Sequence, residues 1–358
     1  MFQRKYLCPV GLVMLLVTVW TLGWFWLART IETGMADYAA RQTSDPVAVS
    51  WDGIDIRGYP TRLFTHITNP RGTWTGSEGD IAWSGPATRL KFFTDFGRTV
   101  SFQSPGRHTF VASGALARDT AQTLAATNKT LIGRMDFDGN ARMVGVRGEA
   151  TGLTLVLDEQ PVTTLDTAAF DWSMTNGAAN PDAIHPAGTR QVLKFSLAGV
   201  SLTDARLDPD LVETIGRKLD RLAGEVALRG PLVAGQNGPE ELARWRDAGG
   251  TVELSEFSLV WGPLRLAGAG TIALDNALQP VGAISARISG LDRLLDLLDR
   301  AGQVRPQQAA IARIALAVLT RAPADGGPPE AQVPITIQDR QVSIGPVRLL
   351  RLPPITWD

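Results

Sequence analysis

Short runs of alternating apolar and polar residues, separated by turn residues roughly every 8–12 positions, fill most of the chain after residue 46. Successive side chains of an extended strand point to opposite faces of a sheet, so each run predicts a short strand with one apolar face. The clearest runs are Arg62–Thr68, Gly79–Trp83, Arg89–Phe93, Val100–Gln103, Thr109–Ser113, Arg134–Phe137, Ala141–Glu149 and Gly152–Leu157. We therefore predict a mainly β fold built on a large curved antiparallel sheet.

One motif occurs twice near the end of the chain. Residues 261–266, Trp-Gly-Pro-Leu-Arg-Leu, are echoed by residues 344–349, Ile-Gly-Pro-Val-Arg-Leu, and the two glycines are 345 − 262 = 83 positions apart. Only two copies occur and predicted helices separate them, which does not favour a solenoid of stacked repeats. We interpret the copies as equivalent strand starts within one sheet.

Helical patterns are few and lie mostly in the C-terminal half. One helix is predicted over residues 208–222, where an apolar face follows the Asp208-Pro209 start at Leu211, Ile215, Leu219 and Leu222. A short helix is predicted from Pro239 through Trp245, with Gly249-Gly250 as its end. Residues 290–301 and 306–321 predict a helical hairpin lying on the sheet. The expected class is α+β with β dominant.

A single transmembrane helix is predicted near the N-terminus, because no charged residue occurs from Leu7 to Leu27. A run of about 21 residues crosses a hydrocarbon core of roughly 30 Å at 1.5 Å per residue. The run is longer than the apolar part of a signal peptide and lacks a small-residue cleavage site, so we expect an uncleaved anchor. Trp24 and Trp26 at its exit are typical of an interfacial aromatic belt.

The orientation of the anchor is predicted from Arg4 and Lys5, which precede the apolar run. Positive charge stays on the cytoplasmic side, so the body after about residue 30 is expected in the periplasm, attached to the inner membrane. We divide the chain into residues 1–30 (cytoplasmic tip and anchor), 31–175 (N-terminal β-rich part) and 188–358 (C-terminal β-rich part with the helical hairpin). One continuous sheet through both β-rich parts is the alternative.

Charge and cysteine content exclude several classes of protein. The net charge is −1 over 358 residues, which lacks the basic excess that drives sequence-independent nucleic-acid binding. The lone cysteine, Cys8, lies at the edge of the apolar run, so the body has no disulfide and no thiolate metal site.

No catalytic, cofactor-binding or metal-binding residue is identified. His66, His108 and His185 are far apart and lack the spacing that places two ligands on one helical face. No Gly-x-Ser-x-Gly elbow occurs, and the glycines at 268 and 270 lie in a strand pattern without the third glycine of a dinucleotide fingerprint. We expect no cofactor and no enzymatic activity; an active site built from scattered residues is the remaining enzymatic alternative.

Large aromatic and aliphatic residues of the body are candidates for an apolar surface. Packing in a core is the ordinary use of such residues, and a wide apolar groove for acyl chains or another partner is the alternative. The candidates are Trp51, Tyr59, Trp83, Trp261, Leu264 and Leu266.

Three stretches together resemble a family of membrane-anchored alphaproteobacterial proteins, the domain of unknown function DUF2125. They are residues 51–60 (WDGIDIRGYP), residues 262–275 (GPLRLAGAGTIALD) and the closing Ile344-Gly345-Pro346 with Leu352–Ile355. The chain departs from the family pattern at Asp339-Arg340, where the pattern favours an Asp-Gly turn.

The resemblance implies no activity and carries over no functional residue. The strand pattern is in turn similar to that of AsmA-like envelope proteins, which are associated with lipid handling and outer-membrane assembly, although likeness of fold is a weak basis for function. We hypothesise a non-enzymatic envelope scaffold that binds lipid or acyl chains. The alternative is an envelope structural or protein-interaction module without a lipid ligand.

Overall fold

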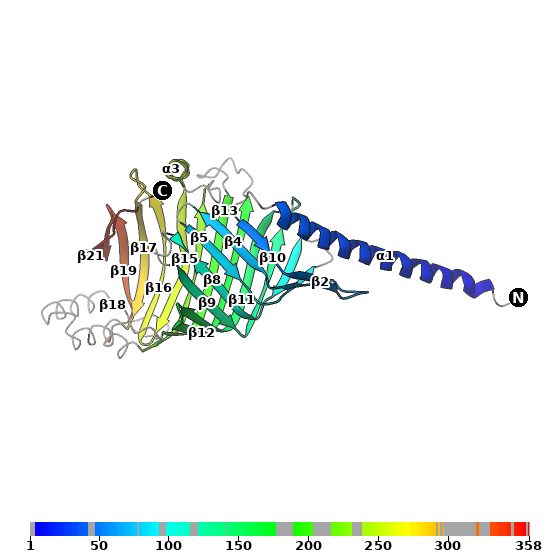
Figure 1. The fold of residues 1–358 in the computed structure, drawn as a ribbon. Coiled ribbons are helices and arrows are strands. Elements are labelled where there is room, and N and C mark those ends of the chain that lie inside the picture. The colour runs from blue at the N-terminus through cyan, green and yellow to red at the C-terminus, as the bar shows by residue number, and fades with distance from the viewer. Residues whose placement is uncertain are drawn as a thin grey trace. The chain divides into compact units, whose positions relative to one another are not determined.

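The structure, a computed structural model, describes most of the chain: residues 4–41, 47–76, 79–92, 98–114, 121–140, 142–176, 189–202, 216–230, 238–290, 293, 296, 320–321, 330–344, 347–355 and 357. It confirms the prediction of a mainly β fold with a large antiparallel sheet and an apolar N-terminal helix (Figure 1). The predicted domain boundary at residues 175–187 and the predicted helical hairpin at residues 290–321 lie largely outside the described residues.

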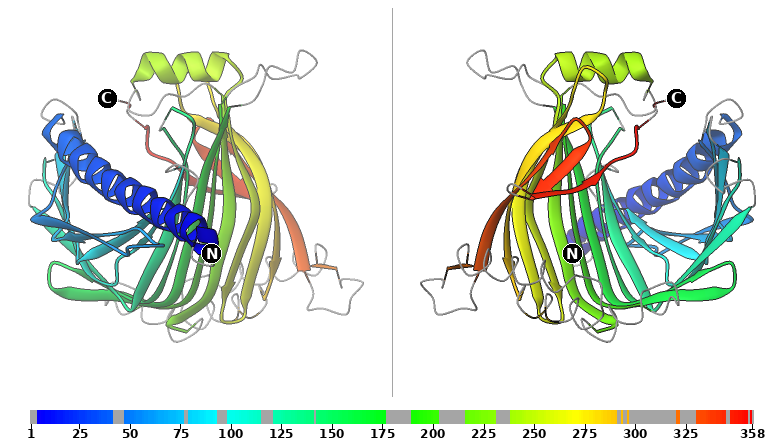
Figure 2. Two further views of the ribbon diagram at one scale, coloured as in Figure 1. Left: turned by 90° about the vertical axis from the view of Figure 1, so that its right-hand side faces the viewer. Right: turned by 90° about the vertical axis from the view of Figure 1, so that its left-hand side faces the viewer.

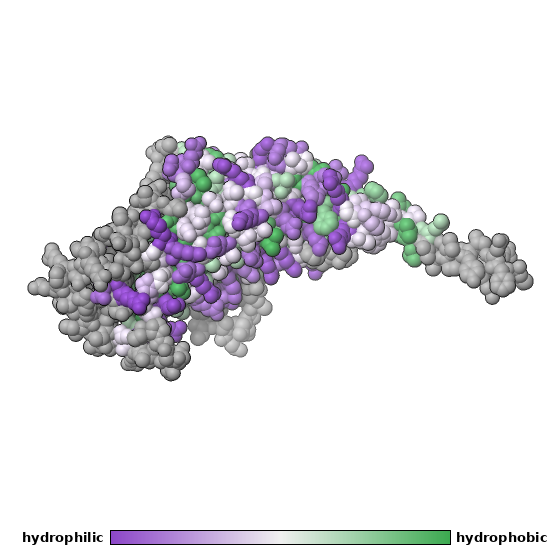
Figure 3. Space-filling model, turned by 90° about the horizontal axis from the view of Figure 1, so that it is seen from below, coloured by the Kyte–Doolittle hydropathy of each residue, from purple (hydrophilic) through white to green (hydrophobic). Residues whose placement is uncertain are grey.

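The N-terminal helix α1 runs unbroken from Arg4 to Arg41, which is 38 residues. Its segment Met14–Asp37 is long and apolar enough to cross a membrane, and only 6% of its most apolar 18-residue stretch is buried. Figure 3 shows hydrophobic side chains on the described part of the helix that projects from the strands. The helix therefore fits a single-pass membrane anchor, although a signal sequence meets the same criterion.

Two compact units share the rest of the chain. Unit 1 comprises residues 1–142 and 155–160, and unit 2 comprises residues 143–154 and 161–358. Strand β11 (Met143–Leu157) begins in unit 2 and ends in unit 1, and β12 (Gln160–Asn176) starts at the edge of unit 1 and continues in unit 2.

Unit 1 contains two antiparallel ladders. One pairs its strands in the order β1–β4–β5–β8–β9, with bounds Val47–Ser50, Arg71–Gly76, Gly79–Ser84, Gly106–Ala112 and Gln122–Asn128. The other pairs them in the order β2–β3–β6–β7–β10, with bounds Gly53–Arg57, Phe64–Thr68, Thr88–Phe92, Thr99–Gln103 and Thr130–Phe137.

The buried residues of unit 1 come from both ladders. Ile67 and Val100 belong to the ladder that contains β2, and His108 and Ala125 belong to the ladder that contains β1. The His108 ring stacks on Trp83 at a centroid distance of 6.1 Å, and its Nε2 lies 3.0 Å from the backbone oxygen of Ser104. A satisfied core histidine is the structural role that these contacts support.

Unit 2 contains a run of antiparallel strands in the order β12–β13–β14–β15–β16–β17–β19–β20–β21, with the short β18 beside β19. Figure 2 shows β13–β17, green to yellow, curving together. The bounds after β12 are β13 Thr189–Leu202, β14 Lys218–Arg229, β15 Thr251–Trp261, β16 Leu264–Leu274, β17 Pro280–Ser289, β18 Thr320–Arg321, β19 Glu330–Gln338, β20 Gln341–Ile344 and β21 Val347–Arg351.

The short helix α3 (Pro239–Asp247) connects β14 to β15 and confirms the prediction for this segment. Pro239 lacks a backbone N–H, which is tolerated in the first turn because the N–H groups there have no intrahelical acceptor, and Glu240 and Glu241 interact favourably with the positive end of the helix dipole. Gly249, with φ of 76°, ends the helix as a left-handed residue.

The prediction of a helix over residues 208–222 is wrong in its last part, because Leu219 and Leu222 lie in β14. Their spacing of three suits one face of a helix. In the structure a register shift between Leu219 and Arg221, a β-bulge, brings both leucines to the same face of the strand. The residues of this prediction before position 216 lie outside the described part.

Both copies of the repeated motif lie at hairpins. Trp261 pairs with Leu264 across the β15–β16 turn, and Ile344 pairs with Val347 between β20 and β21. The closing pairs thus occupy equivalent positions in the two copies. The Asp339-Arg340 turn has φ of 52° and 62°, which is the left-handed pair of a type I′ turn without the glycine that such turns favour.

Candidate functional site

One face of unit 2 is apolar across eight neighbouring strands, from β12 to β20. We define the apolar face by four sets of cross-strand neighbours, which lie on the same side of the sheet. Two sets are Trp172, Leu193, Val226, Leu254, Gly270, Ile284 and Ile335, and Ala168, Leu197, Leu222, Leu259, Leu266, Ile288 and Ala331. The other two are Phe170, Phe195, Gly224, Phe257, Gly268, Ala286 and Val333, and Met174, Gln191, Leu228, Val252, Ile272, Gly282, Ile337 and Val342. None of these residues is ionisable.

Charged side chains of the same strands lie on the opposite face. Lys194 Nζ lies 2.9 Å from Glu225 Oε2, Arg190 Nη2 lies 3.6 Å from Glu225 Oε1, and Arg229 Nε lies 2.7 Å from Glu253 Oε1. The hydrogen bond from Lys194 lowers the pKa of Glu225, and the same bond raises the pKa of Lys194. The sheet therefore separates ionic groups from apolar groups by face.

The apolar face is accessible. Leu193 and Phe170 are 39% and 40% exposed, and most other members are half-buried. Among the members whose burial is described, only Gly224, Ala286, Ala331 and Val333 are buried. A sheet face packed against a second layer buries its large apolar side chains. On this face the large apolar side chains remain accessible to solvent.

Two glycines of unit 2 leave room for aromatic rings to lie along the sheet. A Cβ at Gly224 would lie 3.0 Å from Phe195 Cζ and 3.5 Å from Phe257 Cδ2, and a Cβ at Gly148 would lie 2.7 Å from Phe170 Cε1. The rings of Phe195 and Phe257 thus cover the backbone of β14, and the ring of Phe170 covers that of β11. The aromatic side chains form a low apolar surface instead of standing away from the sheet.

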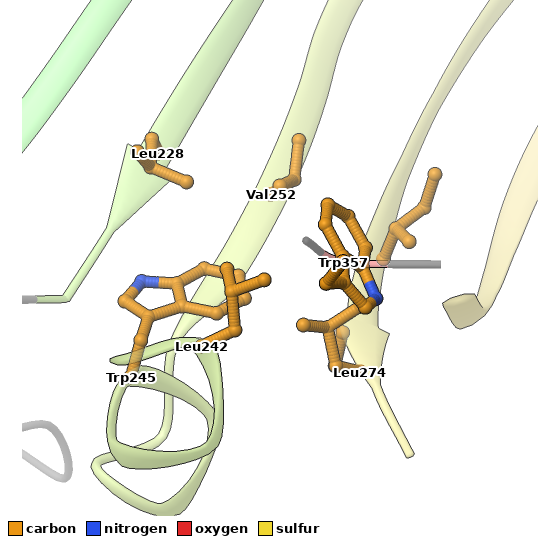
Figure 4. Close-up of a pocket in the computed structure, with 8 residues that line it drawn as sticks. Leu228, Leu242, Trp245, Val252, Leu274 and Trp357 are labelled. Carbon is orange, nitrogen blue, oxygen red and sulfur yellow. The ribbon is translucent and has the colours of Figure 1, made fainter. Parts of the chain in front are cut away.

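A small apolar pocket lies where α3 meets the end of the apolar face. Its volume is about 160 Å³. Figure 4 shows the side chains that line it. A volume of roughly 150 Å³ is enough to hold a benzene-sized apolar group. The lining residues are Leu228, Leu242, Trp245, Val252, Ile272, Ala273, Leu274 and Trp357.

Helix α3 forms one wall of the pocket through the buried residues Leu242 and Trp245. The Trp245 indole N–H donates to the backbone oxygen of Arg229 at 2.7 Å. A Cβ at Gly250 would lie 2.3 Å from the indole, so only glycine fits beneath the ring. Arg246 Nη1 lies 3.2 Å from the backbone oxygens of both Asp275 and Asn276, which fixes α3 to the β16–β17 turn.

The C-terminal segment forms the facing wall. Gln279 exchanges two hydrogen bonds with the backbone of Ile355, both of 2.9 Å, and the Trp357 indole N–H donates to the backbone oxygen of Leu278 at 2.8 Å. The polar atoms of both tryptophans are therefore engaged with backbone. The surfaces that the two tryptophans turn toward the pocket therefore consist of carbon atoms.

The candidates predicted from sequence fall into two groups. Trp261 and Leu264 form a cross-strand pair at one end of the sheet of unit 2, Leu266 belongs to the apolar face, and the Trp261 indole donates to the backbone oxygen of Gly216 at 2.8 Å. Trp51, Tyr59 and Trp83 lie in unit 1. The second group therefore belongs to a different unit from the apolar face.

The sequence analysis did not single out the aromatic members of β12 and β13. Phe170, Trp172 and Met174 alternate along β12, and Leu193, Phe195 and Leu197 alternate along β13. This period of two is the ordinary strand signal and was sufficient to find them. The two strands flank residues 177–188, which are polar and rich in turn-forming residues.

The end of the apolar run of α1 contacts the loop between β2 and β3. The Trp24 indole N–H donates to the backbone oxygen of Arg62 at 2.9 Å, while Trp26 and Leu27 are 69% and 43% exposed. The side chain of Leu7 lies outside the described part. In the residues that the structure describes, no group of three or more His, Cys, Asp or Glu side chains could hold a metal ion.

These features define a class: a mainly β protein with an apolar N-terminal helix and one wide apolar sheet face. Over residues 24–353 the sequence matches the family described as "Uncharacterized protein conserved in bacteria (DUF2125)". The chain belongs to the DUF2125 family, as the resemblance predicted. No curated protein matches the chain.

Proposed function

We propose that the protein is a non-enzymatic envelope scaffold, anchored in the inner membrane by α1, that binds the acyl chains of lipids on the apolar face of unit 2. The observation that carries the proposal is that the four sets of cross-strand neighbours, which extend over eight strands, contain no ionisable side chain while these sets remain accessible. A contiguous exposed apolar area is characteristic of a binding surface for an apolar partner.

The chemistry of the face favours methylene chains. Gln191 and the indole N–H of Trp172 are the only polar side-chain groups of the apolar face, so the face offers few hydrogen bonds to a peptide. An acyl chain needs none, and each methylene removed from water contributes about 0.8 kcal/mol. The pocket beneath α3 extends the same carbon surface at one end of the strands and suits the terminal part of a chain.

Contacts between α1 and unit 1 support retention of the helix. The indole N–H groups of Trp20 and Trp24 donate to the backbone oxygens of Pro60 and Arg62, and the Thr21 hydroxyl is 2.7 Å from the Tyr59 hydroxyl. A signal sequence is removed from the folded protein, whereas these bonds make α1 part of the fold. With Arg4 and Lys5 on the cytoplasmic side, the units lie in the periplasm.

The proposal agrees with the resemblance in strand pattern to AsmA-like envelope proteins, because a large sheet with one apolar face is a shape suited to lipid handling. Likeness of fold alone would be a weak argument, and the accessible apolar face is the stronger one.

Native mass spectrometry of the full chain, extracted from membranes in a mild detergent, tests the proposal. We expect wild type to carry phospholipid, and we expect Phe170→Lys and Leu193→Lys to lose most of it, because each places an ammonium among the apolar side chains. Both side chains are well exposed, so the fold should tolerate the change.

Thr167→Lys is the matched control, because Thr167 is an exposed residue of β12 that points to the opposite face. This variant should retain bound lipid at the wild-type level. Wild type without bound lipid, or equal loss in all three variants, would contradict acyl-chain binding at this face. Co-purification of a defined protein instead would favour an interaction module.

A further inference from the structure

The loop between β2 and β3 is fastened to α1. The Trp20 indole N–H donates to the backbone oxygen of Pro60 at 2.7 Å, and the Trp24 indole N–H donates to that of Arg62 at 2.9 Å. The Tyr59 ring stacks on Phe25 at a centroid distance of 5.8 Å and meets Trp24 edge-on at 5.5 Å. Helix and loop thus form one aromatic cluster.

The position of these contacts along α1 determines how deep the loop lies in a bilayer that α1 spans. Trp20 precedes Leu27, the last residue of the uncharged run, by seven residues, which is about 10 Å along a helix. When α1 spans a membrane, the loop atoms bonded to Trp24 and Trp20 lie about 4 Å and about 10 Å inside the end of the uncharged run. The loop reaches this depth because the hydrogen bonds tie its backbone to α1.

The surface of the loop has the composition of a membrane interface. Tyr59 is 46% exposed although it packs on the helix, and Pro60, Thr61 and Arg62 are exposed. Aromatic rings with a polar tip lie at the headgroup level, and arginine pairs with lipid phosphate in bidentate geometry. Arg29, on the helix after the apolar run, is also exposed.

We propose that the segment Gly58–Arg62 is a second membrane-contact element, with Tyr59 and Pro60 among the acyl chains below the headgroups and the long Arg62 side chain reaching the phosphates. The partner is a phospholipid bilayer. The element holds unit 1 against the membrane surface. The inference rests on the retained helix of the proposed function and does not depend on lipid binding by unit 2.

Site-specific fluorescence in vesicles tests this element. Thr61→Cys, made in a Cys8→Ser background so that it is the only thiol, is labelled with an environment-sensitive dye and reconstituted into vesicles of phosphatidylethanolamine and phosphatidylglycerol. Thr73→Cys, an exposed position on β4 of the same unit, is the matched control. We expect the label at Thr61 to be quenched several-fold more by acyl-chain nitroxides than the control, and less by aqueous iodide.

Equal quenching of the two labels by nitroxide and by iodide would overturn the inference. Loss of the N-terminal residues, seen in the intact mass of the reconstituted protein, would overturn it as well, because the loop would lack its support. Lipid carried by unit 2 is measured separately by native mass spectrometry, so failure of that function does not affect this result. Folding of the labelled variants is verified by comparing their melting curves with that of wild type.

Discussion

At the residue scale, adjacent positions have opposite roles because strand side chains alternate. Leu193 points to the apolar face and is 39% exposed, whereas Lys194 points to the opposite face and binds Glu225. A shift of one residue in the register of β13 would exchange these roles, so the pattern itself specifies the pairing. The ionic side chains on one face and apolar side chains on the other fix the register together.

The Lys194–Glu225 pair makes stability depend on pH. The pKa of Glu225 is below its ordinary value of 4.5. The stability that its carboxylate contributes is therefore fully present above pH 4.5 and is lost as pH falls through the lowered pKa. The pKa of Lys194 is raised above its ordinary value of 10.5. The stability that its ammonium group contributes is therefore fully present below pH 10.5 and is lost as pH rises through the raised pKa.

Glu225→Gln should therefore melt at a lower temperature than wild type between about pH 5 and pH 10, and the difference should shrink in acid. Thermal unfolding recorded across this range by circular dichroism gives the comparison. Glu149→Gln, which removes an exposed carboxylate from β11, is the matched control. A difference between Glu225→Gln and wild type that is constant at every pH would contradict the assignment.

At the element scale, turns and bulges decide how the strands meet. The β19–β20 hairpin turns at Asp339 and Arg340, both with positive φ. Arg340 occupies the second central position, where type I′ turns favour glycine. A left-handed conformation costs a non-glycine residue about 1–2 kcal/mol.

Arg340→Gly should therefore stabilise the protein by about 1 kcal/mol, measured as the free energy of unfolding in urea. Arg287→Gly, which makes the same substitution at an exposed position inside the regular strand β17, should destabilise it, because glycine weakens a strand interior. If Arg340→Gly lowered the stability as Arg287→Gly does, the turn would not have the type I′ geometry.

Many of the strands and the helix α3 could be predicted from the sequence. The alternating runs predicted β3, β5, β6, β7 and β8 within one to three residues of their bounds, and proline and glycine predicted both ends of α3. The strand Leu219–Leu222 could not be predicted, because a bulge gives a strand the apolar spacing of a helix. The pocket could not be predicted either, since its walls come from α3 and from Trp357, more than a hundred residues later.

At the scale of the whole molecule, the chain combines an apolar N-terminal helix, long enough to cross a membrane, with a sheet that has one apolar face. The helix could be predicted from the uncharged run alone, and so could the alternation that makes a sheet one-sided. Accessibility of the apolar face could not, because alternation predicts the same pattern whether a second layer covers the face or leaves it open. That distinction decides between a packed core and a lipid-binding surface.

Photocrosslinking in living cells tests the central claim most directly. A benzophenone amino acid placed at Leu193, on the apolar face, is compared with the same residue placed at Lys194, on the opposite face of the same strand. The account predicts that illumination adds phospholipid, identified by the mass of the adduct, at position 193 and not at position 194. Protein adducts alone at position 193, or equal lipid labelling at both positions, would contradict it.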